Sequence, residues 1–286
     1  MSSKEWLIEL TEYTDPYCSW CWAVEPILRK LKEQYGEQIK ILFKMGGLVD
    51  DVSKFRHLIK NIDVNGILEQ IAIHWDQGSL THGMPVDSNV FQDLKGELMS
   101  TYPANIAYKA AQMQDQDLAD KFLRRLREGA IAERKLIHKI EIQVELAKEI
   151  GLNHDKFIET INNGTAKDLF LKDLDECRRL GITAFPTFKI SNKYGKTIFI
   201  QGFQRYELFA SALEDLIGER LEKKEISLND DNIINFIKKY EKVATQELAT
   251  LFDIRKEDAF NHLSKLKNEG KIKSKQAGNS HFWLDD

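Results

Sequence analysis

Two of the three cysteines in this 286-residue chain lie three positions apart, in the segment 12–31, EYTDPYCSWCWAVEPILRKL. Cys18 and Cys21 could bind a metal, exchange electrons, or form an inert structural pair. A zinc site needs two more ligands, but Cys177 has no neighbouring ligand and the seven histidines show no metal-ligand spacing. A CxxC motif that follows a strand and opens a helix is typical of redox chemistry, so the sequence favours a redox pair.

The elements around this motif indicate a role for each sulfur. Residues 6–13 read as a strand that ends at the turn signal Asp15-Pro16. Apolar residues then recur at helical spacing from Cys18 to Tyr35, and a second strand is predicted over 38–45. A helix N-terminus favours the thiolate, which is the attacking form, so Cys18 is the predicted nucleophile. Cys21, one turn further on, is placed to resolve a mixed disulfide.

The rest of the chain predicts two domains of unequal size. Residues from about 50 to 180 read almost entirely as amphipathic helices, followed by strands at 185–190 and 196–202 and a helix at 205–218. We therefore predict an α/β domain over 1–218 with a large helical insertion. A charged linker at 219–228 precedes 229–286, where three helices and a strand pair give the profile of a winged helix-turn-helix.

Composition limits the classes of function. An apolar fraction of 42% suffices for a core, and a net charge of −4 argues against a protein devoted to nucleic acid or acidic lipid. Residues 226–286 hold ten basic and ten acidic side chains, so DNA binding by the small domain is disfavoured too. The start lacks the features of a signal peptide and no 18-residue apolar run follows, so we expect a soluble, cytoplasmic protein without membrane contact.

The CxxC motif, the helical insertion and the segment GITAFPTF at 181–188 together resemble the DsbA family. The likeness is strongest to its cytoplasmic FrnE-like dithiol–disulfide oxidoreductases. It implies a thioredoxin-like fold, protein or peptide thiols and disulfides as substrates, and a proline in cis, here Pro186, that exposes backbone for a substrate strand beside the sulfurs. No cofactor is implied, because the two sulfurs carry both electrons.

The same resemblance implies further site residues. Glu12 matches an acid that relays protons for the inner cysteine, and Glu25 one that tunes the thiol pKa values. Each is also explicable as a solvated or locally paired acid. Substrate contacts are implied at Trp20, Phe185, Thr187, Met84, Pro85 and Tyr102. The dipeptide Ser19-Trp20 and the bulky Phe185 depart from the family pattern, which leaves the direction of exchange open.

The overall layout also resembles the Firmicute adaptor family that delivers the transcription regulator Spx to the ClpXP protease. This likeness spans nearly the whole chain and implies a client-binding protein whose cysteines are a redox sensor or a relic. A glutathione-dependent isomerase on the same scaffold is a weaker alternative, since such enzymes usually place Ser where Cys18 stands. The intact CxxC makes thiol–disulfide oxidoreductase the leading hypothesis. Cys177 is interpreted as a buried small residue, with a regulatory thiol as the alternative.

Overall fold

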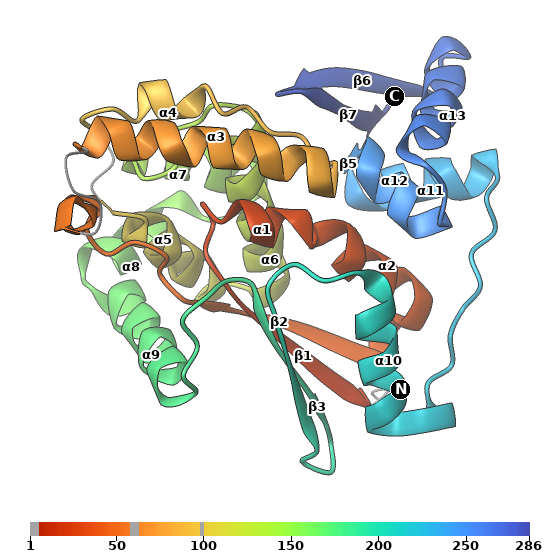
Figure 1. The fold of residues 1–286 in the computed structure, drawn as a ribbon, viewed down its shortest axis with the longest axis horizontal. Coiled ribbons are helices and arrows are strands. Elements are labelled where there is room, and N and C mark those ends of the chain that lie inside the picture. The colour runs from red at the N-terminus through yellow and green to blue at the C-terminus, as the bar shows by residue number, and fades with distance from the viewer. Residues whose placement is uncertain (1–5, 58–62, 98–99) are drawn as a thin grey trace.

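A four-stranded sheet lies at the centre of the molecule, with helices around it and a smaller group of helices and strands at the carboxyl end (Figure 1). The structure is a computed structural model that describes residues 6–57, 63–97 and 100–286. The expectation that the chain starts without a signal peptide rests partly on residues 1–5, which lie outside this range. In the described ranges, no helix combines the length and the apolar character that crossing a membrane requires.

The central sheet consists of β1 (Ile8–Thr14), β2 (Ile39–Met45), β3 (Thr187–Asn192) and β4 (Thr197–Gln201). Its order is β2-β1-β3-β4, with β2 parallel to β1 and β3 and β4 each antiparallel to its neighbour. Strand β1 is central and its side chains are buried on both faces almost throughout. Both the predicted strand–helix–strand unit and the predicted strand pair after residue 184 are present.

The predicted helix from Cys18 to Tyr35 is in fact two helices, α1 (Ser19–Ala23) and α2 (Glu25–Tyr35). Pro26 explains the break. It has no N–H to donate to the carbonyl four residues earlier, at Trp22, and its ring would clash with that carbonyl. The Trp22 carbonyl instead accepts from the N–H of Val24. The first helix is therefore a short segment that begins directly after Cys18 and carries Cys21 and the core residue Trp22.

The stretch between β2 and β3 is helical, and no strand forms in its described residues. Its helices are α3 (Val64–His82), α4 (Val90–Asp93), α5 (Tyr102–Gln112), α6 (Gln116–Arg127), α7 (Ile140–Glu149), α8 (His154–Asn162) and α9 (Thr165–Arg179). A short 3-10 segment precedes them at Val52–His57, and α6 continues into a π turn at Glu128–Ala132. These helices bury one large apolar core, which includes Trp22 from α1.

After helix α10 (Tyr206–Ile217), which packs on the sheet together with α2, an extended segment leads to the C-terminal module. We use this name for α11 (Asp230–Tyr240), β5 (Lys242–Ala244), α12 (Thr245–Phe252), α13 (Lys256–Asn268), β6 (Ile272–Ala277) and β7 (Ser280–Asp285). The module has its own apolar cluster, centred on Leu248, Leu263 and Trp283. Strand β5 was not predicted. Its residues form the edge of the small sheet beside β7 instead of opening a helix.

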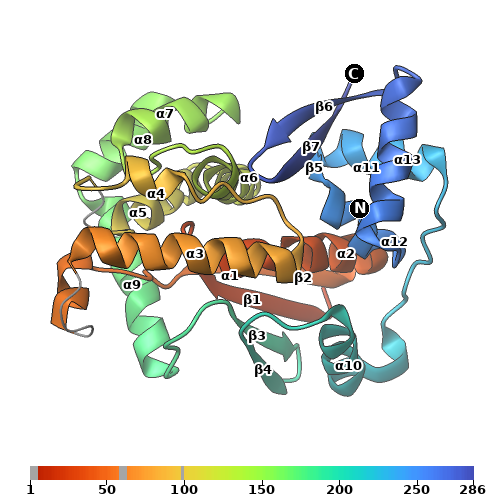
Figure 2. The same cartoon turned by 45° about the horizontal axis from the view of Figure 1, so that its top comes forward.

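The C-terminal module packs against the rest of the chain at two places (Figures 1 and 2). Helix α12 lies on α2, and the β6–β7 hairpin reaches the segment between α3 and α4. There the Asn279 N–H donates to the Val86 carbonyl at 2.9 Å and the Asn279 side chain accepts from the Val86 N–H at 3.1 Å. Phe282 packs edge to face on Trp22, with ring centroids 6.3 Å apart. The module therefore contacts the residue directly after the CxxC motif.

Candidate functional site

Cys18 is held at the start of α1 by the turn that ends β1. The Cys18 N–H donates to the Asp15 carbonyl at 3.0 Å, and Cys18 is the N-cap residue of the helix. Its Sγ accepts the Cys21 N–H at 3.1 Å. A backbone N–H aimed at sulfur stabilises the thiolate more than the thiol, which is the requirement for nucleophilic attack.

The two sulfurs of the motif differ in access and in their surroundings. Cys18 is 5% exposed and Cys21 is fully buried. Burial raises the pKa of Cys21, and the hydrogen bond to Cys18 together with the nearby Glu12 raises it further. All three cysteines are reduced in this structure. The geometry therefore allows Cys18 to meet an outside disulfide while Cys21 waits as a protonated thiol for the second step.

Phe185 and Pro186 directly precede β3 and face the motif. The Phe185–Pro186 peptide bond is cis, and the Cys18 thiol lies 3.7 Å from the Phe185 carbonyl oxygen. The ring of Phe185 lies over Gly46, where a Cβ atom would come within 2.1 Å of it. A side chain at position 46 would therefore push Phe185 away, so this glycine is needed for the close approach of the two segments.

Glu12 and Glu25 share one cation, Arg127. The Arg127 guanidinium donates to Glu12 Oε1 at 2.8 Å and also to Glu25 and to the Thr14 hydroxyl. Arg127 and Glu12 have no exposed surface, and Glu12 Oε2 is a buried atom without a hydrogen-bond partner. Glu25 also contacts Arg124 at 3.5 Å, so Glu12 is the less well compensated of the two carboxylates and the one expected to hold a proton.

Glu12 is the carboxyl group that is expected to hold this proton. Burial raises the pKa of Glu12 to about 7, although Arg127 acts in the opposite direction. For Glu25, burial also acts upward, but Arg127, Arg124 and Arg29 outweigh it and hold the pKa below its usual value. Glu12 can therefore exchange a proton near neutral pH beside Cys21, which is the behaviour that a proton relay for the inner thiol requires.

This difference gives a testable pH dependence. A carboxyl whose pKa rises from 4.5 unfolded to about 7 folded stabilises the folded state at low pH, and this stabilisation is lost as the pH rises between the two values. We expect Glu12→Gln to abolish this pH-dependent loss of folding stability, which in the wild type amounts to about 3 kcal/mol at most. Urea unfolding of both proteins from pH 4.5 to 8 measures it. Glu9→Gln, on the same strand but partly exposed, should leave the profile unchanged; identical profiles for wild type and Glu12→Gln would contradict the assignment.

Two of the implied substrate contacts lie in the core, Trp20, Phe185 and Thr187 lie in or beside the motif, and Tyr102 lies next to Gly47. Met84 has no exposed surface and Pro85 is buried, with its carbonyl accepting the Trp22 indole N–H at 2.8 Å. Tyr102 is partly exposed and packs on Phe170. Thr187 is buried beside Pro186 and its hydroxyl donates to the Ala184 carbonyl.

Trp20 is the exposed part of the motif. Its indole N–H donates to His74 Nε2 at 3.2 Å, and its ring packs edge to face on His82 and lies 5.8 Å from the ring of Phe203. Gly78 of α3 lies under the ring. The indole is therefore fixed over α3, so it forms a rigid aromatic rim beside Cys18.

Cys177 lies on α9, away from the motif. It is 4% exposed, and burial together with the neighbouring Asp173 raises its pKa to about 12. A thiol with so high a pKa is protonated at neutral pH and is a poor nucleophile, as expected for a buried small residue. Nowhere in the described ranges do three or more His, Cys, Asp or Glu side chains gather as a metal site would require.

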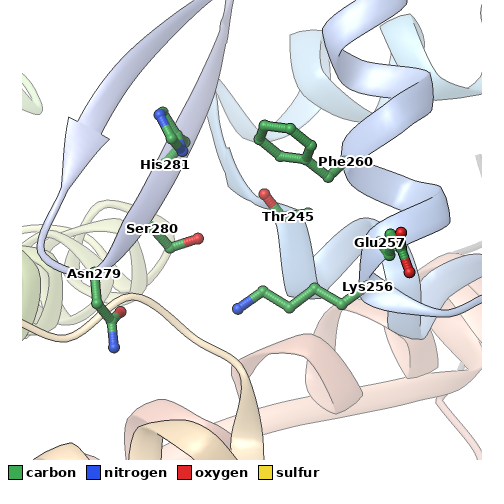
Figure 3. Close-up of a pocket in the computed structure, with 7 residues that line it drawn as sticks. All are labelled: Thr245, Lys256, Glu257, Phe260, Asn279, Ser280 and His281. Carbon is green, nitrogen blue, oxygen red and sulfur yellow. The ribbon is translucent and has the colours of Figure 1, made fainter.

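A concave surface lies in the C-terminal module (Figure 3). It is an open pocket of about 370 Å³ between the start of α13 and β7, lined by Thr245, Lys256, Glu257, Phe260, Asn279, Ser280 and His281. Lys256 extends beneath Thr245 and donates to the Gly83 carbonyl at 2.6 Å. The pocket holds no cysteine and its lysine is engaged with the α3 end, so we assign it no chemistry.

Sequence reasoning missed Arg127 altogether. In the segment LADKFLRRLREGAIA, the arginines and Glu128 read as the solvated face of an amphipathic helix. Only the run of small and apolar residues at 129–132, directly after Glu128, signals that this helix end is buried. Its partner Glu12 is 115 residues away, which no local pattern reveals.

Comparison with known proteins supports the fold and extends to the whole chain. Residues 12–211 match the thioredoxin family. A putative protein disulfide isomerase from Nitrosomonas europaea superposes with a TM-score of 0.61 at 19% identity, over 73% of this chain and 97% of that one. The cytosolic disulfide reductase DsbM from Pseudomonas aeruginosa superposes with a TM-score of 0.56 at 21% identity, over 72% of this chain and 97% of its own.

Another relative covers the C-terminal module as well. The ClpXP adapter protein SpxH of Halalkalibacterium halodurans is 30% identical over 279 residues, which are 96% of this chain and 88% of the relative. The structural neighbours confirm the predicted thioredoxin-like α/β fold with its helical insertion. The chain belongs to the thioredoxin family and, within it, to the family of the ClpXP adapter protein SpxH.

Proposed function

We propose that this chain is an adaptor that binds a protein client and brings it to the ClpXP protease. The observation that carries the proposal is the similarity to an SpxH adapter over 96% of the chain, the C-terminal module included. The disulfide isomerase and reductase structures match only 73% and 72% of it. A pure oxidoreductase does not need the added module, whereas an adaptor needs surface for a client and for a protease. A regulator of the Spx type is the client that the family implies.

We also propose that Cys18 and Cys21 carry out reversible thiol–disulfide exchange with a protein substrate. Cys18 attacks a substrate disulfide, and Cys21 then attacks Cys18 and releases the reduced substrate. The observation that favours this second function is the position of the Cys18 sulfur, which accepts the Cys21 N–H, lies 3.7 Å from the Phe185 carbonyl and is the more exposed of the two sulfurs at 5%. Trp20, Phe185 and Thr187 are the proposed substrate contacts, and Glu12 is the proposed proton acceptor for Cys21.

One capture experiment distinguishes the two functions. Cys21→Ala strands substrates on Cys18 as mixed disulfides, and the Cys18→Ala/Cys21→Ala variant is the matched control. Proteins that bind only while Cys18 is present and are released by reductant support the exchange function. A client that both variants hold equally, and that reductant does not release, supports the adaptor. Recovery of neither class from cells that express the chain would contradict both proposals.

A further inference from the structure

The C-terminal module contributes a buried carboxylate to the ion pairs behind the cysteines. Glu247, in the first turn of α12, has no exposed surface. Arg124 of α6 donates to its two oxygens at 2.8 and 3.0 Å, and Arg29 of α2 lies 2.8 Å from Oε1. A carboxylate from the module therefore fills a position between two arginines of the thioredoxin-like part.

These arginines connect Glu247 to the cysteine pair. Arg124 also contacts Glu25 at 3.5 Å, and Glu25 pairs with Arg127, which holds Glu12 at 2.8 Å. Glu12 is the carboxyl that raises the pKa of Cys21. The ion pairs thus run from α12 to Glu12, whose charge acts on the inner sulfur.

The network contains three arginines and three carboxyl groups, namely Arg29, Arg124 and Arg127 with Glu12, Glu25 and Glu247, and Glu12 is the carboxyl that exchanges a proton near neutral pH. A flanking pair adds no net charge, because Glu128, which also contacts Arg124 at 2.9 Å, is matched by Lys242 of the module at 2.8 Å. Removal of the Glu247 charge alone makes the net charge of the network more positive by one unit, in a site shielded from water. Charges interact strongly in such a site, because little solvent screens them.

We propose that Glu247 is a positioning residue for the Cys18–Cys21 couple, so that docking of the C-terminal module sets the thiol–disulfide equilibrium of the motif. Glu247 holds the Arg124 side chain in position, and Arg124 in turn contacts Glu25. Arg127 then holds Glu12 near Cys21. The inference rests on the exchange function proposed above and assigns the module a part in it. An adaptor built this way couples the oxidation state of its cysteines to the placement of the module.

The direction of the effect follows from charge. In exchange with glutathione disulfide, the two thiols lose two protons and two electrons, the Cys18–Cys21 bond forms, and two glutathione thiols are released. A surplus positive charge favours a thiolate over a neutral thiol and over the uncharged disulfide. Loss of the Glu247 charge should therefore shift the couple toward the reduced pair, as in oxidants whose reduced form is stabilised.

Glutathione redox titration of the full chain tests this inference. We expect Glu247→Gln to change the equilibrium constant about threefold to tenfold toward the reduced pair. The matched control is Asp253→Asn, which removes another ion pair between the module and α2, that of Asp253 with Lys30, without changing the charge of the network. Asp253 has φ 54°, a conformation that Asn also accepts. An unchanged constant in folded Glu247→Gln, or an equal shift in Asp253→Asn, would overturn the inference.

If Glu247→Gln does not fold, a measurement on the wild-type chain tests the coupling between module docking and the Cys18–Cys21 couple. Linkage requires that the oxidation state change the docking equilibrium by the same factor as docking changes the couple. Amide hydrogen exchange in α12 should therefore differ between oxidised and reduced protein, and the double cysteine variant should show no response to oxidant. Equal protection in both states overturns the inference alone. Failure of the wild type to form any Cys18–Cys21 disulfide overturns the exchange function together with it.

Discussion

Cys18→Ser is expected to reduce the rate of disulfide exchange by on the order of 10³-fold or more, to the rate without protein. A serine hydroxyl is not ionised at neutral pH and cannot form a disulfide, so neither step of the exchange remains. Cys21→Ser should behave differently. The first attack by Cys18 survives, but the mixed disulfide accumulates because no second thiol resolves it. Reduction of a fluorescent disulfide peptide, followed over time with mass analysis of the products, measures both effects.

Cys177→Ser serves as the control in the same assay. Its thiol is buried and its pKa lies at about 12, so the rate should stay within about twofold of the wild type. Loss of activity in Cys177→Ser with normal folding would show a third reactive thiol. Substantial exchange in Cys18→Ser would show that Cys18 is not the nucleophile and would assign that role to Cys21 or to a group outside the motif.

Arg127→Met is expected to destabilise the folded chain by about 3–5 kcal/mol, because it leaves buried carboxylates without their cation. Arg127 is fully buried and donates to Glu12, Glu25 and Thr14. Methionine fills a similar volume, so the loss reports charge pairing more than a cavity. Glu25 keeps a contact with Arg124 at 3.5 Å and is therefore not left without any cation, which limits the loss in the free energy of unfolding. Urea unfolding monitored by tryptophan fluorescence gives the difference.

Two further variants check the cause. Arg134→Met removes an arginine that pairs with Asp93 on the surface, where its side chain is 42% exposed, and should cost less than about 1 kcal/mol. Adding Glu12→Gln to Arg127→Met should recover part of the lost stability, since one stranded carboxyl is then gone. A small effect of Arg127→Met, or no recovery in the double variant, would contradict the buried-network account.

The sequence was most informative where structure depends on local pattern. The strand before the CxxC motif, the helical insertion and the strand pair after Phe185 each follow from periodicity and turn residues within about ten positions. The same holds for Cys18 at a helix start, because Asp15-Pro16 ends the strand just before it. The break before α2 was also within reach of the sequence, since Pro26 is visible there.

Long-range contacts account for what the sequence left out. Arg127 and Glu247 lie in segments far from Glu12, and each reads locally as an ordinary surface charge. Glu12 itself was implied as a site residue by the family resemblance, but its pairing with Arg127 was not. Only packing of α6 between the sheet and α12 removes them from water. Met84 shows the reverse case. It resembles a groove residue in its segment, but it is fully buried in the core.

The network gives the two proposed functions a common physical basis. The adaptor function depends on the C-terminal module and the exchange function depends on Cys18 and Cys21, and Glu247 belongs to the module while its charge acts toward the cysteines. A client that binds across the two parts would meet a surface whose arrangement depends on the oxidation state of the motif. Binding itself needs no covalent bond, so recruitment should survive replacement of both cysteines.

The most direct measurement is the degradation rate of a purified Spx-type regulator by purified ClpXP, with and without this chain. The account predicts that the wild-type chain and the Cys18→Ala/Cys21→Ala variant both accelerate degradation at least tenfold, which corresponds to about 1.4 kcal/mol or more of added recruitment. An unrelated ClpXP substrate should be degraded at the same rate in all three reactions. A folded wild-type chain that leaves the rate of the regulator unchanged would contradict the adaptor function.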